Sequence, residues 1–381
     1  MSLRRTLVAL VAAALLVAGC SSSKSNADGS TIKVSVSGAP SEPVFTQRGP
    51  YAAGVTTLQL GDRRVEVWYP VDPNAVKGKT ADAYSIATWL PPEVAAKIPA
   101  DQQATFPTKA YRDVPASKKG PFPLVVFSHG VLSFRDQSTF LTDHLASWGL
   151  VVMAPDHLER GIATIFQPAT KPVDDVGDLK RTIDLGLAED GRAGSILQGR
   201  IDEKNIGAVG HSAGGAAVLK LGETDPRVKV VVSLTTPLLD AANWPAGKPV
   251  MFIAGSADQI IPSQSVVDSY NALTNAPKRL VLIMGAGHLA FSEICEIGKE
   301  RGGILKIAQS NGVALSDQVI RLGSDGCNPP DVAPTAAWPV IDNFATAQLA
   351  NTFRLDRTPI GLGDGVQNQF PGVQVQYQQA S

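Results

Sequence analysis

The chain has 381 residues, of which 44% are apolar, and its formal net charge is −1. This apolar content is sufficient for a buried core in one large domain or two smaller ones. The charge is nearly balanced and no long basic run occurs. The chain therefore lacks the excess of positive charge that is typical of nucleic-acid-binding proteins, and no nucleic-acid partner is expected.

The first residues predict an export signal. Arg4 and Arg5 precede an apolar run over residues 7–18. This run is too short to span a membrane, but it has the length of the apolar part of a signal peptide. We therefore expect the protein to leave the cytoplasm.

The end of the apolar run reads VAGC, residues 17–20, and a polar stretch follows it. It resembles the bacterial lipobox, which implies a lipoprotein signal peptide over residues 1–19 and lipid attached to Cys20. Residues 20–30 would then be a flexible tether, because their composition cannot bury enough apolar surface to become ordered. The protein would be anchored through Cys20 to the outer face of a bacterial membrane. An ordinary cleaved signal peptide is the alternative.

Residues 31–360 are expected to form a single α/β domain. Alternation with a period of two predicts half-buried antiparallel strands at residues 31–36, 56–60 and 64–70. Short continuous apolar runs, typical of parallel strands buried on both faces, follow at residues 124–127, 150–154, 206–209, 228–232, 250–254 and 280–284. Helical stretches separate these runs, at residues 137–147, 176–199, 213–221 and 263–273. This order predicts a mostly parallel, doubly wound sheet with antiparallel N-terminal strands.

The remaining segments are expected to lie around this domain. Residues 71–120 have no clear period and are interpreted as an insertion with a helical patch near residues 93–97. Residues 289–335 are interpreted as a cover segment over the mouth of the site, and residues 361–381 as a frayed tail. Helices are expected at residues 291–309 and 338–354.

Cys295 and Cys327 are the two cysteines that remain after the predicted cleavage. We expect a disulfide between them, because an exported protein meets an oxidising environment. Such a bridge would contribute about 3–4 kcal/mol and would pin the cover segment. Two separate buried thiols are the alternative, and metal ligation is disfavoured because no histidine is nearby.

One motif predicts a nucleophile. The sequence Gly210-His211-Ser212-Ala213-Gly214 matches the G-x-S-x-G elbow, in which a serine is exposed on a sharp turn between a strand and a helix. An apolar run precedes it and a helical stretch follows it, as the elbow requires. The glycines fit a turn so tight that side chains at their positions would collide with neighbouring backbone.

A serine nucleophile needs a base and an acid that orients the base. His288 is the predicted base, because it directly follows the last apolar run. Asp258 is the predicted acid, because it follows the preceding strand at the edge where open α/β sheets place their sites. Asp240 is the alternative acid. The other four histidines are expected to be structural, and none has the spacing of a metal site, so neither a metal nor a cofactor is expected: His129, His144, His157 and His211.

The oxyanion of an acyl-transfer intermediate needs two N–H donors. The backbone N–H of Ala213, the residue after the nucleophile, is one predicted donor. The other is expected in the loop after residues 127–130, where Val131 is the best placed and Leu132 is the alternative.

Several segments resemble known families. FSHGVLSFRDQSTFLTDHLASWGLVVMAPDH, GRIDEKNIGAVGHSAGGAAV and the early VEVWYP are similar to platelet-activating-factor acetylhydrolase and dienelactone-hydrolase-like esterases. SLTTPLLD through PVMFIAGSADQIIP to MGAGHLAF resembles cutinase-type polyester hydrolases. The resemblance implies an α/β-hydrolase fold and hydrolysis of a small-molecule or lipid ester through an acyl-enzyme. It also implies a triad of Ser212, His288 and Asp258, with Val131 and Ala213 as the oxyanion donors.

Two departures limit this resemblance. Thr235 occupies the region where the acetylhydrolases have their acid, which favours Asp258. Leu238 stands where cutinases commonly have an aromatic residue, so polyester or phospholipid specificity is not implied. Two other interpretations stay open: a surface lipoprotein that binds a ligand without catalysis, and a peptidase or acyltransferase that uses the same triad. Nothing in the sequence predicts an oligomeric state.

Overall fold

The computed structural model describes residues 37–355 and 358–380. The predicted signal peptide, Cys20, the tether and the strand expected at residues 31–36 lie outside these residues. Across the two described ranges, no helix combines the length and apolarity needed to span a membrane.

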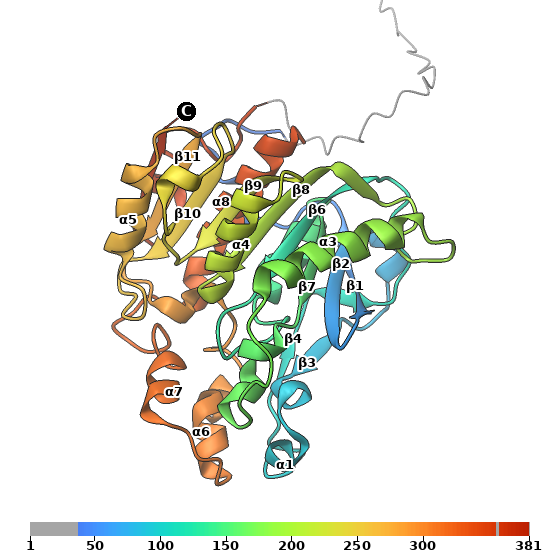
Figure 1. Cartoon of the computed structure of the whole chain (residues 1–381), viewed down its shortest axis with the longest axis vertical. Helices are drawn as coiled ribbons and strands as arrows, with labels where there is room; N and C mark the ends of the chain where they lie inside the picture. The colour runs from blue at the N-terminus through green and yellow to red at the C-terminus, as the bar shows by residue number, and fades with distance from the viewer. Residues whose placement is uncertain (1–36, 356–357, 381) are drawn as a thin grey trace, which may run out of the picture. The chain divides into compact units, whose positions relative to one another are not determined.

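A ten-stranded sheet is the centre of the fold, in the order β12-β11-β10-β9-β8-β6-β7-β2-β1-β5 (Figure 1). Strands β6 to β11 pair in parallel, whereas β2 is antiparallel to β7 and β1, and β12 is antiparallel to β11. The predicted fold class is confirmed. The strands are β1 (Ala52–Leu60), β2 (Arg63–Val71), β5 (Ala110–Arg112), β6 (Phe122–Ser128), β7 (Val151–Pro155), β8 (Ile201–His211), β9 (Val228–Leu234), β10 (Val250–Gly255), β11 (Lys278–Ile283) and β12 (Val375–Ala380).

Helices cover both faces of this sheet, so the central strands are buried on both sides (Figure 1). In β6, Val125 and Phe127 pack into the cluster on one face, and Leu124 and Val126 pack into the cluster on the other. This two-sided burial explains why such strands read as continuous apolar runs. One cluster includes side chains of α2 (Thr139–Ser147) and α8 (Pro334–Phe353), and the other those of α3 (Asp175–Gly191), α4 (Ala213–Thr224) and α5 (Ser263–Ala272).

The insertion contains its own short elements. Strands β3 (Ala83–Ser85) and β4 (Thr105–Pro107) form a two-stranded sheet, and β5 extends the main sheet by pairing with β1. A short helix, α1 (Pro92–Ala95), lies between β3 and β4. The 3₁₀ helices of the chain are η1 (Val44–Thr46), η2 (Pro73–Val76), η3 (Ile86–Trp89), η4 (Leu158–Arg160), η5 (Ile162–Ile165), η6 (Ala241–Asn243), η7 (His288–Phe291), η8 (Lys299–Arg301) and η9 (Val366–Gln369).

The cover segment is less helical than expected. Instead of one helix over residues 291–309, it contains η7, η8 and α6 (Gly303–Ser310), and α7 (Asp317–Leu322) follows. Gly298, Gly302 and Gly303 have φ values of 67°, 87° and 83°, a left-handed conformation that ends a regular helix. The helix predicted to reach residue 199 likewise ends at Gly191.

The prediction of a frayed tail after residue 361 is wrong. Residues 375–380 form β12, which pairs along the whole of β11 from Val375 opposite Ile283 to Ala380 opposite Lys278. The buried Val373 and Val375 alternate with exposed glutamines at positions 374 and 376. This period of two indicates a strand, but the Gly- and Gln-rich composition concealed it.

Candidate active site

The nucleophile elbow has the geometry that its glycines predict. Strand β8 ends at His211 and α4 begins at Ala213. Between them Ser212 has a φ of 57° and a ψ of −123°, a strained conformation for a residue with a side chain. A Cβ atom at Gly210 would lie 2.2 Å from the carbonyl oxygen of Gly214, and one at Gly214 would lie 2.0 Å from that of Ser128. Glycine is therefore required at both positions.

The structure brings Ser212, His288 and Asp258 together. The Nε2 atom of His288 lies 2.9 Å from the hydroxyl of Ser212, and its Nδ1 atom lies 2.8 Å from a carboxylate oxygen of Asp258. The other oxygen of Asp258 accepts hydrogen bonds from the backbone N–H groups of Ile260 and Ile261, at 2.8 and 2.7 Å. Because these contacts fix the carboxylate, the histidine ring has one preferred orientation, with Nδ1 protonated and Nε2 free to accept the serine proton.

Asp240, the alternative acid, is not part of this arrangement. Its carboxylate accepts hydrogen bonds from the backbone N–H of Ala242 and the side-chain amide of Asn243. These contacts begin η6, a typical use of aspartate before a helical turn. The geometry therefore favours Asp258 as the partner of His288.

The loop after β6 contains Val131 and Leu132, the two candidates for the second oxyanion donor. The N–H of Leu132 donates to the carbonyl of Arg160 at 2.7 Å, so it is not available to a substrate. The backbone N–H groups of Val131 and Ala213 have no protein acceptor within the described residues. Val131 is 39% exposed. It lines a cleft that Ser212 and His288 also line. This pattern favours Val131 over Leu132.

Gln137, which the sequence analysis did not identify, connects three segments of the site. Its side-chain oxygen accepts a hydrogen bond from the N–H of Gly130 at 2.7 Å, and its amide donates to Nδ1 of His211 at 2.8 Å. The Nε2 atom of His211 in turn lies 3.1 Å from the carbonyl of His288. Burial lowers the pKa of His211 well below its usual value, so the ring is neutral and donates to this carbonyl. No motif marks Gln137, because its partners come together only in the fold.

Asp325, also not identified from the sequence, connects the acid loop to the base loop. One oxygen accepts a hydrogen bond from the N–H of His288 at 2.6 Å, and the other accepts one from the N–H of Gln259 at 3.2 Å. Asp325 belongs to the cover segment and lies close in sequence to Cys327. The disulfide expected between Cys295 and Cys327 is present, so it anchors the strip of chain that carries Asp325.

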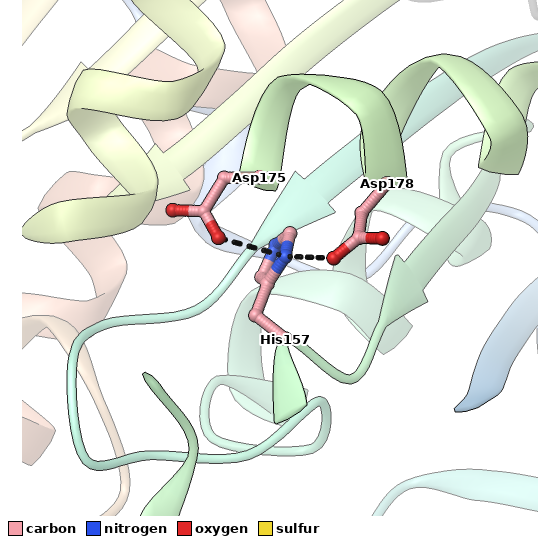
Figure 2. A group of neighbouring side chains, drawn as sticks. All are labelled: His157, Asp175 and Asp178. Carbon is pink, nitrogen blue, oxygen red and sulfur yellow. Dashed lines mark hydrogen bonds and ion pairs between the residues drawn. The ribbon is translucent and has the colours of Figure 1, made fainter. Parts of the chain in front are cut away.

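A second group of titratable side chains lies outside the cleft (Figure 2). Nδ1 of His157 is 3.0 Å from Asp178 and 3.2 Å from Asp175, and its Nε2 is 2.9 Å from the hydroxyl of Ser128. Ser128, His157 and Asp178 have the same serine–histidine–aspartate hydrogen bonding as the candidate triad, but all three residues are fully buried and none lines the cleft.

An imidazole and two carboxylates, as in this second group, could ligate a metal ion. Here, however, these side chains already pair with other residues. Asp178 pairs with Arg63 and Arg181, and Asp175 pairs with Arg160 at 2.7 Å. Burial lowers the pKa of His157 well below its usual value, so the ring is neutral. We assign this group a structural role, joining the end of β7 to α3.

The sheet topology, the serine turn between β8 and α4, and an aspartate and a histidine that follow later strands together define an α/β hydrolase. Within this class, the chain belongs to the PET hydrolase-like family, because residues 108–306, more than half of the chain, match that family's model.

Relatives agree with this assignment and confirm the resemblance to cutinases. The chain is 29% identical over 170 residues to a bis(hydroxyethyl) terephthalate hydrolase of Streptomyces coelicolor, covering 44% of this chain and 50% of the relative. It is 29% identical over 169 residues to cutinase 1 of Thermobifida cellulosilytica, covering 44% of this chain and 60% of the relative. The chain thus spans about half the length of the curated relatives it matches.

One solved structure shows the same fold over most of the chain. A ferulic acid esterase from Streptomyces cinnamoneus superimposes with a TM-score of 0.55 at 22% identity, covering 86% of this chain and 97% of that one.

Proposed function

We propose that this protein hydrolyses carboxylic esters, with Ser212 as nucleophile, His288 as general base and Asp258 as the group that orients the base. One observation carries the proposal: hydrogen bonds join Asp258, His288 and Ser212 in that order, at the wall of a cleft. A serine hydroxyl is a poor nucleophile at neutral pH, and this arrangement activates it. Two relatives are named as a bis(hydroxyethyl) terephthalate hydrolase and a cutinase, which supports the same type of reaction.

In the first half of the reaction, the Ser212 oxygen attacks the carbonyl carbon of the ester while its proton passes to Nε2 of His288. The resulting oxyanion accepts hydrogen bonds from the backbone N–H groups of Val131 and Ala213. The intermediate then collapses, the bond to the alcohol oxygen breaks, and His288 returns its proton to the leaving alcohol. The acyl group remains bound to Ser212.

In the second half, His288 takes a proton from a water molecule that attacks the acyl-enzyme. The new tetrahedral intermediate uses the same two N–H donors. Its collapse breaks the bond to Ser212, which regains its proton from His288, and releases the carboxylic acid. The ion pair between protonated His288 and Asp258 stabilises the charge that develops in both halves.

The experiment compares two serine variants in hydrolysis of p-nitrophenyl butyrate. Ser212→Ala should lower kcat by about 10⁴-fold or more, whereas Ser128→Ala, in the buried second group, should retain activity because Ser128 does not reach the cleft. A fluorophosphonate probe should label wild type and Ser128→Ala but not Ser212→Ala. Unchanged hydrolysis by Ser212→Ala would refute the assignment. Steady release of free acid with water as the sole acceptor would argue against a transferase.

The N-terminal residues complete the proposal. An export signal over residues 1–19 and lipid on Cys20, followed by a tether over residues 20–30, would hold the hydrolase on the outer face of a bacterial membrane. The supporting observation is the arginine-apolar-VAGC order of the sequence. Labelling of cells with an alkyne fatty acid should mark the wild-type protein and not Cys20→Ala, and recovery of both from the soluble fraction would contradict the anchor.

A further inference from the structure

The cleft beside Ser212 extends well beyond the reacting groups. Its lining extends from Ser212 and His288 to the insertion and to α6 and α7. Within the described part of the chain, no Asp, Glu, Lys or Arg lines it, and Phe134 and Phe166 are its only Phe, Tyr or Trp residues. Most of the remaining wall consists of Ile, Leu and Val. The wall of the cleft is therefore more extended and more aliphatic than the triad alone requires.

Two segments far apart in sequence contribute much of the wall, beside the loop after β6 and η5. The insertion contributes an aliphatic row, and the cover segment contributes the facing row from α6 and α7. On α6, Ile304, Ile307 and Ala308 line the cleft while Lys306 and Gln309 are exposed, so the helix is amphipathic with its apolar face turned inward. The insertion row is Ile86, Leu90, Val94 and Ile98.

Contacts between the insertion and the cover segment hold these walls together. Asn311, just after α6, donates to the side chain of Gln102 at 2.9 Å, and Arg301 donates to the carbonyl of Asp101 at 2.9 Å. At another contact, the hydroxyl of Tyr84 donates to Glu293 at 2.8 Å. The cover segment thus bridges to the insertion and roofs part of the cleft.

Polarity changes along the cleft. Gln137, His211 and His288 accompany Ser212, and the other lining residues with polar side chains are Ser85, Gln103 and Ser133. The residues contributed by α6 and α7 are all aliphatic, and Gly323 follows α7. A substrate with one ester group and a flexible hydrocarbon chain matches this distribution. Burial of each methylene group against these aliphatic residues contributes a favourable transfer energy.

We propose that this cleft binds the aliphatic acyl chain of the ester, of octanoyl length or longer, in preference to an aromatic acyl group. The inference rests on the ester hydrolysis proposed above and adds its substrate class. We assign the cleft to the acyl part of the ester and not to the alcohol part. The acyl group stays bound to Ser212 beside the cleft until water attacks, whereas the alcohol leaves before that step.

The first test measures kcat/KM for p-nitrophenyl acetate, butyrate, octanoate, decanoate and benzoate. We expect kcat/KM to rise from acetate to decanoate, mainly through KM, by up to about fourfold for each methylene that becomes buried, and benzoate to fall below octanoate. Highest activity on acetate or benzoate would overturn the inference and leave the esterase function standing.

Matched variants on α7 localise the effect. Val319 lines the cleft, whereas its neighbour Ile320 is equally half-buried but does not line it. Val319→Trp should lower the decanoate-to-acetate ratio of kcat/KM by about tenfold, since an indole would occupy the space of several methylene groups. Ile320→Trp should leave this ratio unchanged. Equal effects of the two variants would contradict the proposed position of the chain.

A binding measurement decides the inference independently of turnover. Ser212→Ala should bind sodium decanoate more tightly than sodium benzoate in calorimetric titrations, and Val319→Trp in the same background should remove the difference. Equal affinities would overturn the inference even in an active esterase. If decanoate binds preferentially while the wild type hydrolyses no ester, the acyl-chain site is supported and the proposed function fails.

Discussion

Asp325 contacts His288 through the backbone of the histidine and not through its ring. The carboxylate accepts the N–H of His288 at 2.6 Å, while the ring is held separately by Asp258 at 2.8 Å. Two aspartates thus act on one histidine in different ways. Asp258 sets the tautomer of the ring, and Asp325 sets the position of the loop that carries it.

Asp325→Asn should therefore lower kcat by about 10- to 100-fold, because a displaced base loses the geometry of attack. The two N–H groups use different carboxylate oxygens, and in the amide one of these positions becomes an NH₂ group that cannot accept. The pH at which activity falls on the acidic side should stay close to that of the wild type. Asp331→Asn, in the same segment, is the control and should behave as wild type. A shifted acidic limb in Asp325→Asn would instead indicate an action on the ring.

Gln137→Leu should reduce both activity and stability. The substitution leaves the N–H of Gly130 and the Nδ1 atom of His211 buried without partners, at about 1–3 kcal/mol each. Urea denaturation should show this loss, and kcat should fall because the Val131 loop is no longer fixed against the elbow. Gln264→Leu, at a position whose amide bonds only Asp268, is the control. A stable but inactive Gln137→Leu would mean that the glutamine matters for alignment alone.

Glu293 should make stability depend on pH. Burial raises the pKa of its carboxyl from 4.5 to about 8, so between these values the folded protein retains a proton that the unfolded chain releases. The free energy of unfolding should fall as pH rises through this range, by at most about 1.4 kcal/mol per pH unit. Thermal denaturation from pH 5 to 8 should show that the stability of Glu293→Gln depends less on pH than that of the wild type. The control Glu300→Gln, at an exposed position, should show the same dependence as the wild type. An identical slope in Glu293→Gln would assign the pH dependence to other groups.

Removal of the disulfide should cost stability and activity together. The bridge closes a loop with a sequence separation of 32 residues, so Cys295→Ser combined with Cys327→Ser should lose about 3–4 kcal/mol of unfolding free energy in guanidinium titrations. Because Asp325 lies beside Cys327 in sequence, kcat should fall as well. Reductant should lower the unfolding free energy and the kcat of the wild type and leave those of the double variant unchanged. Full activity of the reduced wild type would show that Asp325 holds its position without the disulfide.

The sequence was informative where a function depends on a local pattern. Ser212, His288 and Asp258 could be proposed because each follows a recognisable apolar strand, in the chain order of an α/β hydrolase. Gln137 and Asp325 could not, because their roles consist of hydrogen bonds to groups of other segments, which come together only in the fold. The positive-φ glycines that divide the cover segment could not be predicted either. The composition around Gly302 is that of a helix, and it does not reveal the turn that interrupts the helix.

Strand β12 gives residues 375–380 an influence on His288, the proposed base. It covers the outer edge of β11, and β11 leads directly into the loop that presents His288. Without β12 the backbone N–H and C=O groups along that edge would be unpaired, open to pairing with another chain. Trimming the protein at residue 374 to remove a seemingly dispensable tail would therefore loosen the support of the base and promote aggregation at the same time.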